Sequence, residues 1–220
     1  MEILDKLNIS YHNIELYKQA FTHTSYANEE NCQSYERLEY LGDAVLELVI
    51  SEYLFNNTCF PEGKMTKLRS SYVCENALYE YACRLGINEE ILLGKGEKDR
   101  NGKQNKTIVA DVFEAFIGAV FIDCGMDGAK AFIHRNIIPL IEDNSIDFIE
   151  DYKSVLQEMV QTDRKSLEYV IINEDGPAHA REFTVAVKID EIIYGEGKAN
   201  SKKEAEQEAA KEALKKAQGI

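Results

Sequence analysis

The sequence predicts two domains, a mostly α-helical domain followed by a small α+β domain with the element order α-β-β-β-α. Up to residue 143, one segment with a helical pattern follows another. After residue 150, a helical segment precedes three stretches in which apolar and polar residues alternate, as in strands, and a last helical segment follows them. We therefore expect domains at 1–143 and 151–220, joined by a linker at 144–150.

The amphipathic segments of the first domain predict helices over 13–22, 35–55, 62–85, 88–93, 107–123 and 127–138. The segment 107–123 is apolar on nearly every side, which is typical of a buried central helix, and Gly118 would let a neighbouring helix approach closely. Gly125 is expected to stop this helix, and Pro139 is expected to break or kink the next one. Residues 94–105 contain glycines and no apolar residue, which predicts a loop.

The second domain is expected to pack two helices on one face of an antiparallel sheet. Its predicted helices span 151–162 and 202–216, and its predicted strands span 167–173, 182–189 and 192–197. In the second strand the apolar residues of one face alternate with polar ones, and Asp190-Glu191 predicts a tight turn into the third strand. Asn200 or Ser201 is expected to cap the last helix.

The composition of the 220-residue chain, 45% hydrophobic and 29% charged, is that of an ordinary soluble protein with room for two cores. No apolar run approaches the roughly 20 residues of a membrane span, so no membrane partner is expected. The first residues lack the pattern of a signal peptide, which predicts a cytoplasmic location. The five cysteines form no CxxC pair, and we expect reduced thiols rather than disulfides or zinc ligands.

The formal net charge of −14 argues at first against a nucleic-acid partner. The charge is uneven, however, because 11 of the 25 basic residues but only 14 of the 39 acidic residues follow residue 150. Most of the excess negative charge therefore lies in the first domain. The class of binding partner therefore has to be inferred from local clusters of charged residues rather than from the net charge.

Four acidic residues of the segment 35–55 fall on one helical face, because they are three or four positions apart: Glu36, Glu39, Asp43 and Glu47. Like charges at this spacing repel one another and destabilise a helix by a few tenths of a kcal/mol per pair. A divalent cation would compensate for this repulsion. A solvated acidic face is the alternative.

Asp111 and Glu114 add two carboxylates to one face of the buried helix. Burying a carboxylate is costly unless a partner offsets the charge. Asp111 could act as a cap, and Glu114 could pair with Arg69 or Lys67. A cation shared between the two helices is the other explanation, and hard carboxylate oxygens suit Mg²⁺ or Mn²⁺ rather than zinc.

Four stretches of the first domain carry a resemblance to a known family: FTHTSYA at 21–27, ERLEYLGDAVL at 36–46, FPEG at 60–63 and ADVFEA at 110–115. Together they resemble the signature of the ribonuclease III family and cover nearly the whole helical domain. The resemblance implies metal ligands at Glu39, Asp43, Asp111 and Glu114. It implies that Glu36 and Glu62 assist RNA binding and cleavage beside the catalytic Asp43 and Glu114, and that Gly42 permits close helix packing. Glu47 matches no ligand of the family.

The implied reaction is Mg²⁺-dependent hydrolysis of phosphodiester bonds in double-stranded RNA, with Mn²⁺ as a possible substitute. Its products would carry 5′-phosphate and 3′-hydroxyl ends with short 3′ overhangs. Tyr40 matches a family position that inserts into a second subunit, which implies a homodimer with two sites for two strands. A partly buried core tyrosine is the alternative for Tyr40.

The second domain resembles the double-stranded-RNA-binding domain, through DYKSVLQE at 151–158, GPAHAREF at 176–183, GEGK at 195–198 and SKKEAE at 201–206. Such domains recognise the shape of an A-form duplex over about 16 base pairs. The resemblance implies that six residues contact RNA: Gln157, Glu158, His179, Lys198, Lys202 and Lys203. A solvated charged helix is the alternative for Lys202 and Lys203.

The basic segment 94–106 could contact phosphates or could be a solvated loop. Taken together, these features predict a double-strand-specific endoribonuclease that processes ribosomal and other structured RNA precursors. A duplex-RNA binder without catalysis is the alternative from another class, although it would not need the complete set of acids. A small-molecule metal hydrolase would leave the second domain unexplained.

Overall fold

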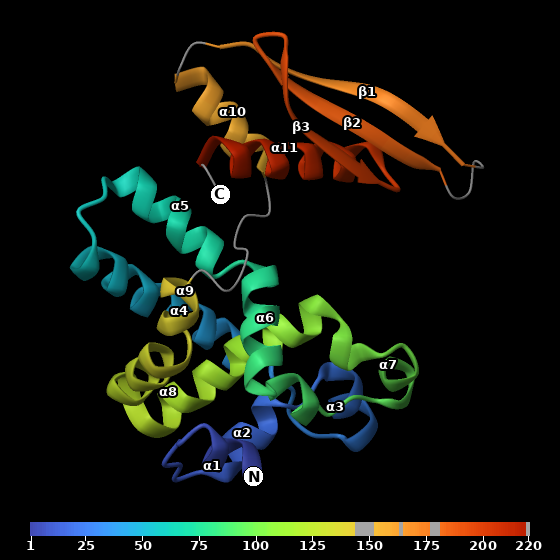
Figure 1. Cartoon of the computed structure of the whole chain (residues 1–220). Coiled ribbons are helices and arrows are strands. Elements are labelled where there is room, and N and C mark those ends of the chain that lie inside the picture. Colours follow the sequence, from blue (N-terminus) through green and yellow to red (C-terminus); the bar gives the residue numbers. More distant parts are fainter. Residues whose placement is uncertain (144–151, 163–164, 177–180, 219–220) are drawn as a thin grey trace. The chain divides into compact units, whose positions relative to one another are not determined.

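The computed structural model describes residues 1–143, 152–162, 165–176 and 181–218 (Figure 1). The chain forms two compact units, Met1–Phe148 and Ile149–Ile220. The predicted linker at 144–150 lies outside the described residues. None of the helices in the described ranges is long and apolar enough to cross a membrane.

The first unit is helical, as predicted. Its helices are α1 (Glu2–Lys6), α2 (Ile14–Ala20), α3 (Thr24–Glu30), α4 (Glu36–Asn57), α5 (Glu62–Tyr72), α6 (Glu75–Leu85), α7 (Lys95–Asp99), α8 (Lys106–Asn136) and α9 (Ile138–Glu142), with 3₁₀ turns at Ile87–Glu90 and Gly102–Gln104. Helix α8 is the buried centre of the unit, because α2, α4 and α6 all pack against it.

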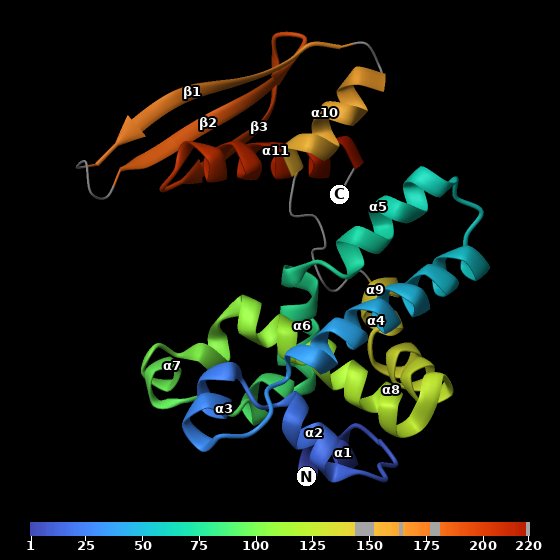
Figure 2. The ribbon, with the colours of Figure 1, turned by 180° about the vertical axis from the view of Figure 1, so that it is seen from behind.

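Helices α4 and α8 cross at two glycines, and they lie side by side in both views of the chain (Figures 1 and 2). A Cβ atom on Gly42 would lie 1.8 Å from the carbonyl oxygen of Glu114, and one on Gly118 would lie 2.2 Å from the carbonyl oxygen of Leu38. The two backbones are therefore in direct contact. This contact confirms the close approach expected at Gly42 and Gly118, and it brings the acids of the two helices together.

The single helix predicted over 62–85 is wrong, because the chain bends at Val73 and Cys74 and forms α5 and α6. Cys74 has an extended conformation, with φ −70° and ψ 157°. Helix α5 packs on α4, whereas the apolar face of α6 packs on α8. One straight helix could not present an apolar face to both neighbours.

The loop predicted over 94–105 is also wrong in part, because it contains α7 and a 3₁₀ turn. Helix α3 holds the start of this segment in place. The Gly94 N–H donates to Ser25 Oγ at 2.9 Å, and the Lys95 N–H donates to Glu29 Oε1 at 2.9 Å. Tertiary hydrogen bonds thus order a stretch that has no apolar side chains of its own.

Gly125 interrupts α8 as predicted, with φ 72° and ψ −176° inside an otherwise helical segment. This conformation is strained for residues that carry a Cβ atom. Pro139 lies in the first turn of α9, where its missing N–H costs nothing. The break at Gly125 places Asp123 and Cys124 at the end of the first part of α8.

The second unit has the predicted order: α10 (Tyr152–Thr162), β1 (Leu167–Asp175), β2 (Glu182–Ile189), β3 (Ile192–Ala199) and α11 (Lys202–Gln218). The strands form an antiparallel sheet in the order β1-β2-β3. Asp190 and Glu191 both have positive φ and form the tight turn between β2 and β3. Helix α11 packs on β2 and β3 and also contacts α10, and a core of Leu156, Val187 and alanines of α11 lies between them.

Candidate metal centre and duplex-binding surface

The α4–α8 crossing brings three carboxylates together: Glu39 from α4, and Asp111 and Glu114 from α8. One oxygen of each lies within 4.8 Å of one oxygen of the other two. All three residues are half-buried, whereas Asp43, one turn after Glu39, is exposed. Asp43 still acts on both glutamates, because its charge raises the pKa of Glu39 and of Glu114.

The electrostatics of this cluster favour neutral or cation-bound carboxylates. Burial, with help from the neighbouring carboxylates, raises the pKa of Glu39 to about 7 and that of Glu114 to about 8. Burial also raises the pKa of Asp111. Arg69, one of the two basic residues that the sequence offers as a partner for Glu114, donates to Ser51 Oγ at 3.3 Å. A divalent cation among the three acids would offset both the desolvation and the repulsion.

Tyr35 supports the cluster from the residue before α4. Its hydroxyl donates to Asp111 Oδ2 at 3.0 Å, and its side chain is only 4% exposed. Its ring lies 5.8 Å from the ring of His23. The sequence reasoning did not assign a role to Tyr35, although its spacing of four residues from Glu39 indicates that it shares the acidic face.

The other acids lie in different surroundings. Glu36 is exposed and accepts a hydrogen bond from Ser34 Oγ at 2.9 Å. Glu47 is close enough to raise the pKa of Glu114. Glu62, at the start of α5, is exposed and borders an apolar cavity between α4, α5 and α8 rather than the three-acid cluster.

Several large apolar side chains of α4 and α8 are exposed. Tyr40 is 83% exposed on α4, so the alternative of a partly buried core tyrosine is wrong for the single chain. Leu48 and Phe55 on α4 and Ile122 on α8 are also exposed. The cavity has a volume of about 470 Å³, and Leu48, Phe55 and Met65 contribute to its apolar walls.

The basic residues expected to contact RNA are exposed in the second unit. Lys202 and Lys203 lie in the first turn of α11, and Lys198 lies on β3. Two of these lysines already have anionic partners: Lys198 Nζ lies 2.6 Å from Glu182 Oε2, and Lys202 Nζ lies 3.3 Å from Glu174 Oε1.

On α10 the side chain of Gln157 is exposed. His179 and the side chain of Glu158 lie outside the described part of the chain. The Ser201 hydroxyl accepts a hydrogen bond from the Glu204 N–H at 3.3 Å, so Ser201 is the cap of α11. This cap fixes the point at which Lys202 and Lys203 enter the helix.

Comparison with known proteins agrees with this arrangement in both units. Residues 13–141 match the family model described as ribonuclease-III-like, and residues 152–217 match the double-stranded RNA binding motif. The chain belongs to the ribonuclease III family. Membership confirms the predicted family, the two-part fold and the class of enzyme, a ribonuclease III type endoribonuclease.

Curated relatives align over nearly the whole chain. Ribonuclease 3 of Bacillus velezensis is 48% identical over 99% of this chain and 89% of its own length. Ribonuclease 3 of Halalkalibacterium halodurans is 47% identical over 97% of this chain and 83% of its own length. The solved nuclease domain of ribonuclease III from Campylobacter jejuni is 35% identical, with a TM-score of 0.59 over 62% of this chain and 94% of that domain.

The residues of this ribonuclease III fit a divalent cation. Its three clustered carboxylates supply hard oxygen donors, and their raised pKa values indicate anions that lack sufficient compensating charge. Mg²⁺ keeps several water ligands and needs only a few carboxylates, which suits a half-buried and partly open cluster. The double-stranded-RNA-binding unit supplies the second requirement of the enzyme, a means of holding a duplex.

Proposed function

We propose that this double-stranded-RNA endoribonuclease hydrolyses phosphodiester bonds with Mg²⁺ held by Glu39, Asp43, Asp111 and Glu114, and that Mn²⁺ can substitute. The observation that carries the proposal is the group of three half-buried carboxylates at the α4–α8 crossing. Bound Mg²⁺ would supply an activated water and neutralise charge on the leaving 3′-oxygen. The products would then carry 5′-phosphate and 3′-hydroxyl ends.

The protein's own groups have separate tasks in this proposal. Tyr35 donates a hydrogen bond to one oxygen of Asp111, which restrains that carboxylate and leaves its other oxygen available to a cation. Asp43 is exposed and can rotate toward Glu39 and Glu114 when the charge of a cation is present. Glu36 and Glu62 lie outside the cluster, and we assign them to RNA binding and assistance of cleavage.

We further propose a homodimer formed through the apolar surface that contains Tyr40. Tyr40 is 83% exposed on α4, and burying an exposed aromatic side chain against a symmetric partner is favourable. The partner subunit's Tyr40 would enter the cavity bordered by Leu48, Phe55 and Met65. The solved Campylobacter jejuni nuclease domain is described as having a region involved in dimer formation, which supports this arrangement. Two sites would then cut the two strands at offset positions and leave short 3′ overhangs.

Duplex binding by the second unit is assigned to Gln157 and Glu158 on α10, to His179, and to the basic residues Lys198, Lys202 and Lys203. Lys198 and Lys202 would exchange their glutamate partners for phosphates. We propose that the substrates are ribosomal and other structured RNA precursors, because their stems are A-form duplexes of the kind that this unit recognises. We further propose that cleavage takes place in the cytoplasm.

The decisive experiment incubates the full chain with a long end-labelled RNA duplex in Mg²⁺, in Mn²⁺ and in EDTA, and resolves the products on a denaturing gel. We expect cleavage with either metal and none in EDTA. Glu114→Gln should lose cleavage while duplex affinity in a gel-shift assay stays near that of the wild type. Glu47→Gln is the matched control, because it removes an acid of the same face that is not assigned to metal. Cleavage by Glu114→Gln at the wild-type rate would refute the metal site.

A further inference from the structure

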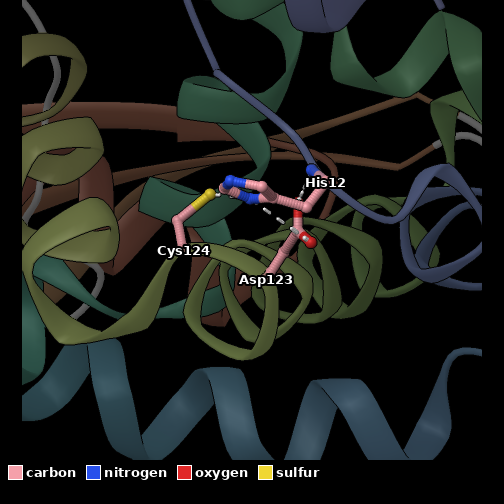
Figure 3. Close-up of side chains that lie close together, drawn as sticks. All are labelled: His12, Asp123 and Cys124. Carbon is pink, nitrogen blue, oxygen red and sulfur yellow. Dashed lines mark hydrogen bonds and ion pairs between the residues drawn. The ribbon is translucent and has the colours of Figure 1, made fainter.

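A second group of metal-binding side chains lies at the end of the first part of α8, away from the acid cluster. It consists of His12, Asp123 and Cys124, shown together in Figure 3. One potential ligand atom of each lies within 4.8 Å of those of the other two. Asp123 follows Asp111 by twelve residues, which corresponds to about 18 Å along a helix, so the two groups are separate sites.

Asp123 is held rigidly within this group. Its side chain is only 3% exposed. Its Oδ2 accepts hydrogen bonds from the backbone N–H of His12 at 2.8 Å and from the Tyr17 hydroxyl at 3.1 Å. Its Oδ1 accepts one from the backbone N–H of Asn13 at 2.9 Å. A carboxylate has about four acceptor positions, so one on Oδ1 remains open. Hydrogen bonds of this kind orient carboxylates that bind metals.

Cys124 is also held in place, beside Asp123. Its Sγ lies 3.3 Å from the Ser10 carbonyl oxygen and 3.9 Å from Asp123 Oδ2. Burial raises the pKa of the thiol, so the group is a neutral thiol until a metal replaces its proton. Metal binding would transfer that proton to solvent and leave a thiolate ligand.

His12 is the movable member of the group. Its side chain is 77% exposed, and its Nδ1 lies 4.0 Å from Asp123 Oδ1. Ligand atoms of a tetrahedral Zn²⁺ lie roughly 3.3–3.8 Å apart, given bond lengths of about 2.0–2.3 Å. Rotation of the exposed imidazole can bring Nδ1 closer to Asp123, as a shared ion would require.

We propose that His12, Asp123 and Cys124 bind a zinc ion, with water as the fourth ligand. Thiolate, imidazole and carboxylate are each ligands of Zn²⁺, whereas a thiolate is unsuited to Mg²⁺, so this site and the acid cluster select different ions. A cavity of about 320 Å³, bordered in part by Ser10, His12 and Cys124, gives water access to the open position. The ion would fasten the segment before α2 to the end of the first part of α8, and would stabilise the fold without taking part in cleavage.

The test uses the reduced full chain, stripped of metal and then kept in excess Mg²⁺ so that the carboxylate cluster is occupied. Co²⁺ serves as a spectroscopic probe of the site, and Zn²⁺ is then added to displace it. We expect one tightly bound ion per chain, a thiolate-to-cobalt charge-transfer band that Zn²⁺ removes, and a higher melting temperature with Zn²⁺. Cleavage of duplex RNA in Mg²⁺ should not change.

Two variants and a control decide the outcome. Cys124→Ser should lose the charge-transfer band, and His12→Ala should weaken Zn²⁺ binding by roughly tenfold or more. Cys59→Ser removes an exposed cysteine elsewhere and should behave as the wild type. Asp123 is left intact, because its hydrogen bonds hold the start of α2. A band that persists in Cys124→Ser, or equal Zn²⁺ affinity in wild type, Cys124→Ser and His12→Ala, would overturn the proposal.

Discussion

The Tyr35 hydroxyl donates a hydrogen bond to Asp111 Oδ2 at 3.0 Å and so connects the start of α4 to the acidic face of α8. Tyr35 is buried and Asp111 is half-buried, and the bond lowers the pKa of a carboxyl whose pKa burial raises. Tyr35 therefore acts on Asp111 in two ways, by orienting it and by favouring its ionised form. Both effects prepare Asp111 to bind a cation.

Removing this hydroxyl should weaken the metal site more than the fold. We expect Tyr35→Phe to lower Mn²⁺ or Mg²⁺ affinity roughly 10–100-fold, which is typical when an orienting partner of a metal ligand is lost. Isothermal titration calorimetry measures this affinity independently of cleavage, and saturating metal should restore much of the activity. Tyr11→Phe is the control, because Tyr11 is exposed and distant in sequence from the acids. Unchanged metal affinity in Tyr35→Phe would contradict the orienting role.

The stability of the metal-free protein should depend on pH through Glu39 and Glu114. Folding raises their pKa values from the usual 4.5 to about 7 and about 8. An acid whose pKa is raised by folding contributes stability below its unfolded pKa and loses this contribution as pH rises through its folded pKa. We therefore expect the melting temperature in EDTA to fall between about pH 5 and about pH 8.5.

Magnesium should have the opposite dependence, because it binds the ionised carboxylates. The increase in melting temperature caused by Mg²⁺ should grow over the same pH range. Glu114→Gln should flatten both profiles, whereas Glu47→Gln should leave most of the dependence in place. A metal-free melting temperature that stays constant from about pH 5 to about pH 8.5 would show that folding does not raise the pKa of these acids.

Changing Lys202 and Lys203 together to Ala should weaken duplex binding for all sequences alike. The slope of log affinity against log salt should become shallower by about one to two, since each phosphate contact contributes about one. Lys216→Ala is the control, because Lys216 lies at the other end of α11. Fluorescence anisotropy at several salt concentrations provides the measurement, and an unchanged slope would place the RNA elsewhere.

The ion pair between Lys202 and Glu174 adds a test in the opposite direction. Glu174 lies 3.3 Å from Lys202 Nζ and also pairs with Arg181 at 3.5 Å. Glu174→Gln should release both cations and tighten duplex binding at low salt, with less effect at high salt. Weaker binding by this variant would show that the pair positions the lysine rather than competing with phosphate.

A charge at position 40 should separate the proposed dimer. Tyr40→Asp would bury a carboxylate in an apolar pocket of the partner, so we expect a monomer in multi-angle light scattering at micromolar concentration. Tyr40→Phe keeps the ring and should remain dimeric. A wild-type monomer, or a Tyr40→Asp dimer as stable as the wild type, would contradict the assigned interface.

The proximity of Glu39, Asp111 and Glu114 could be predicted in part, because some of the information is local. Spacings of three and four residues place Glu39 with Asp43, and Asp111 with Glu114, before any tertiary structure is known. The glycines that allow α4 and α8 to touch are also visible in the sequence. The mutual distances of the acids and the burial of Tyr35 depend on how the helices cross, and no spacing within one helix contains that information.

The errors have the same origin. The chain bends at Val73 and Cys74 because α5 packs on α4 whereas α6 packs on α8. The segment 94–105 is structured because its start is hydrogen-bonded to Ser25 and Glu29. His12 and Cys124 are 112 positions apart in the sequence and come together only in the fold, so no local spacing indicates that they are neighbours. Predictions failed where the deciding contacts join distant parts of the chain.

The contact between Gly42 and the Glu114 backbone has a consequence for which ions the acids accept. Main-chain atoms in contact cannot be compressed, so they fix the spacing of the two helix backbones that carry the carboxylates. A small ion such as Mg²⁺, with ligand distances of about 2.0–2.1 Å, is compatible with a fixed spacing, whereas Ca²⁺ needs about 2.3–2.6 Å and more ligands. We therefore expect the close backbone contact at Gly42 and Gly118 to favour cations of small radius at the acids of α4 and α8.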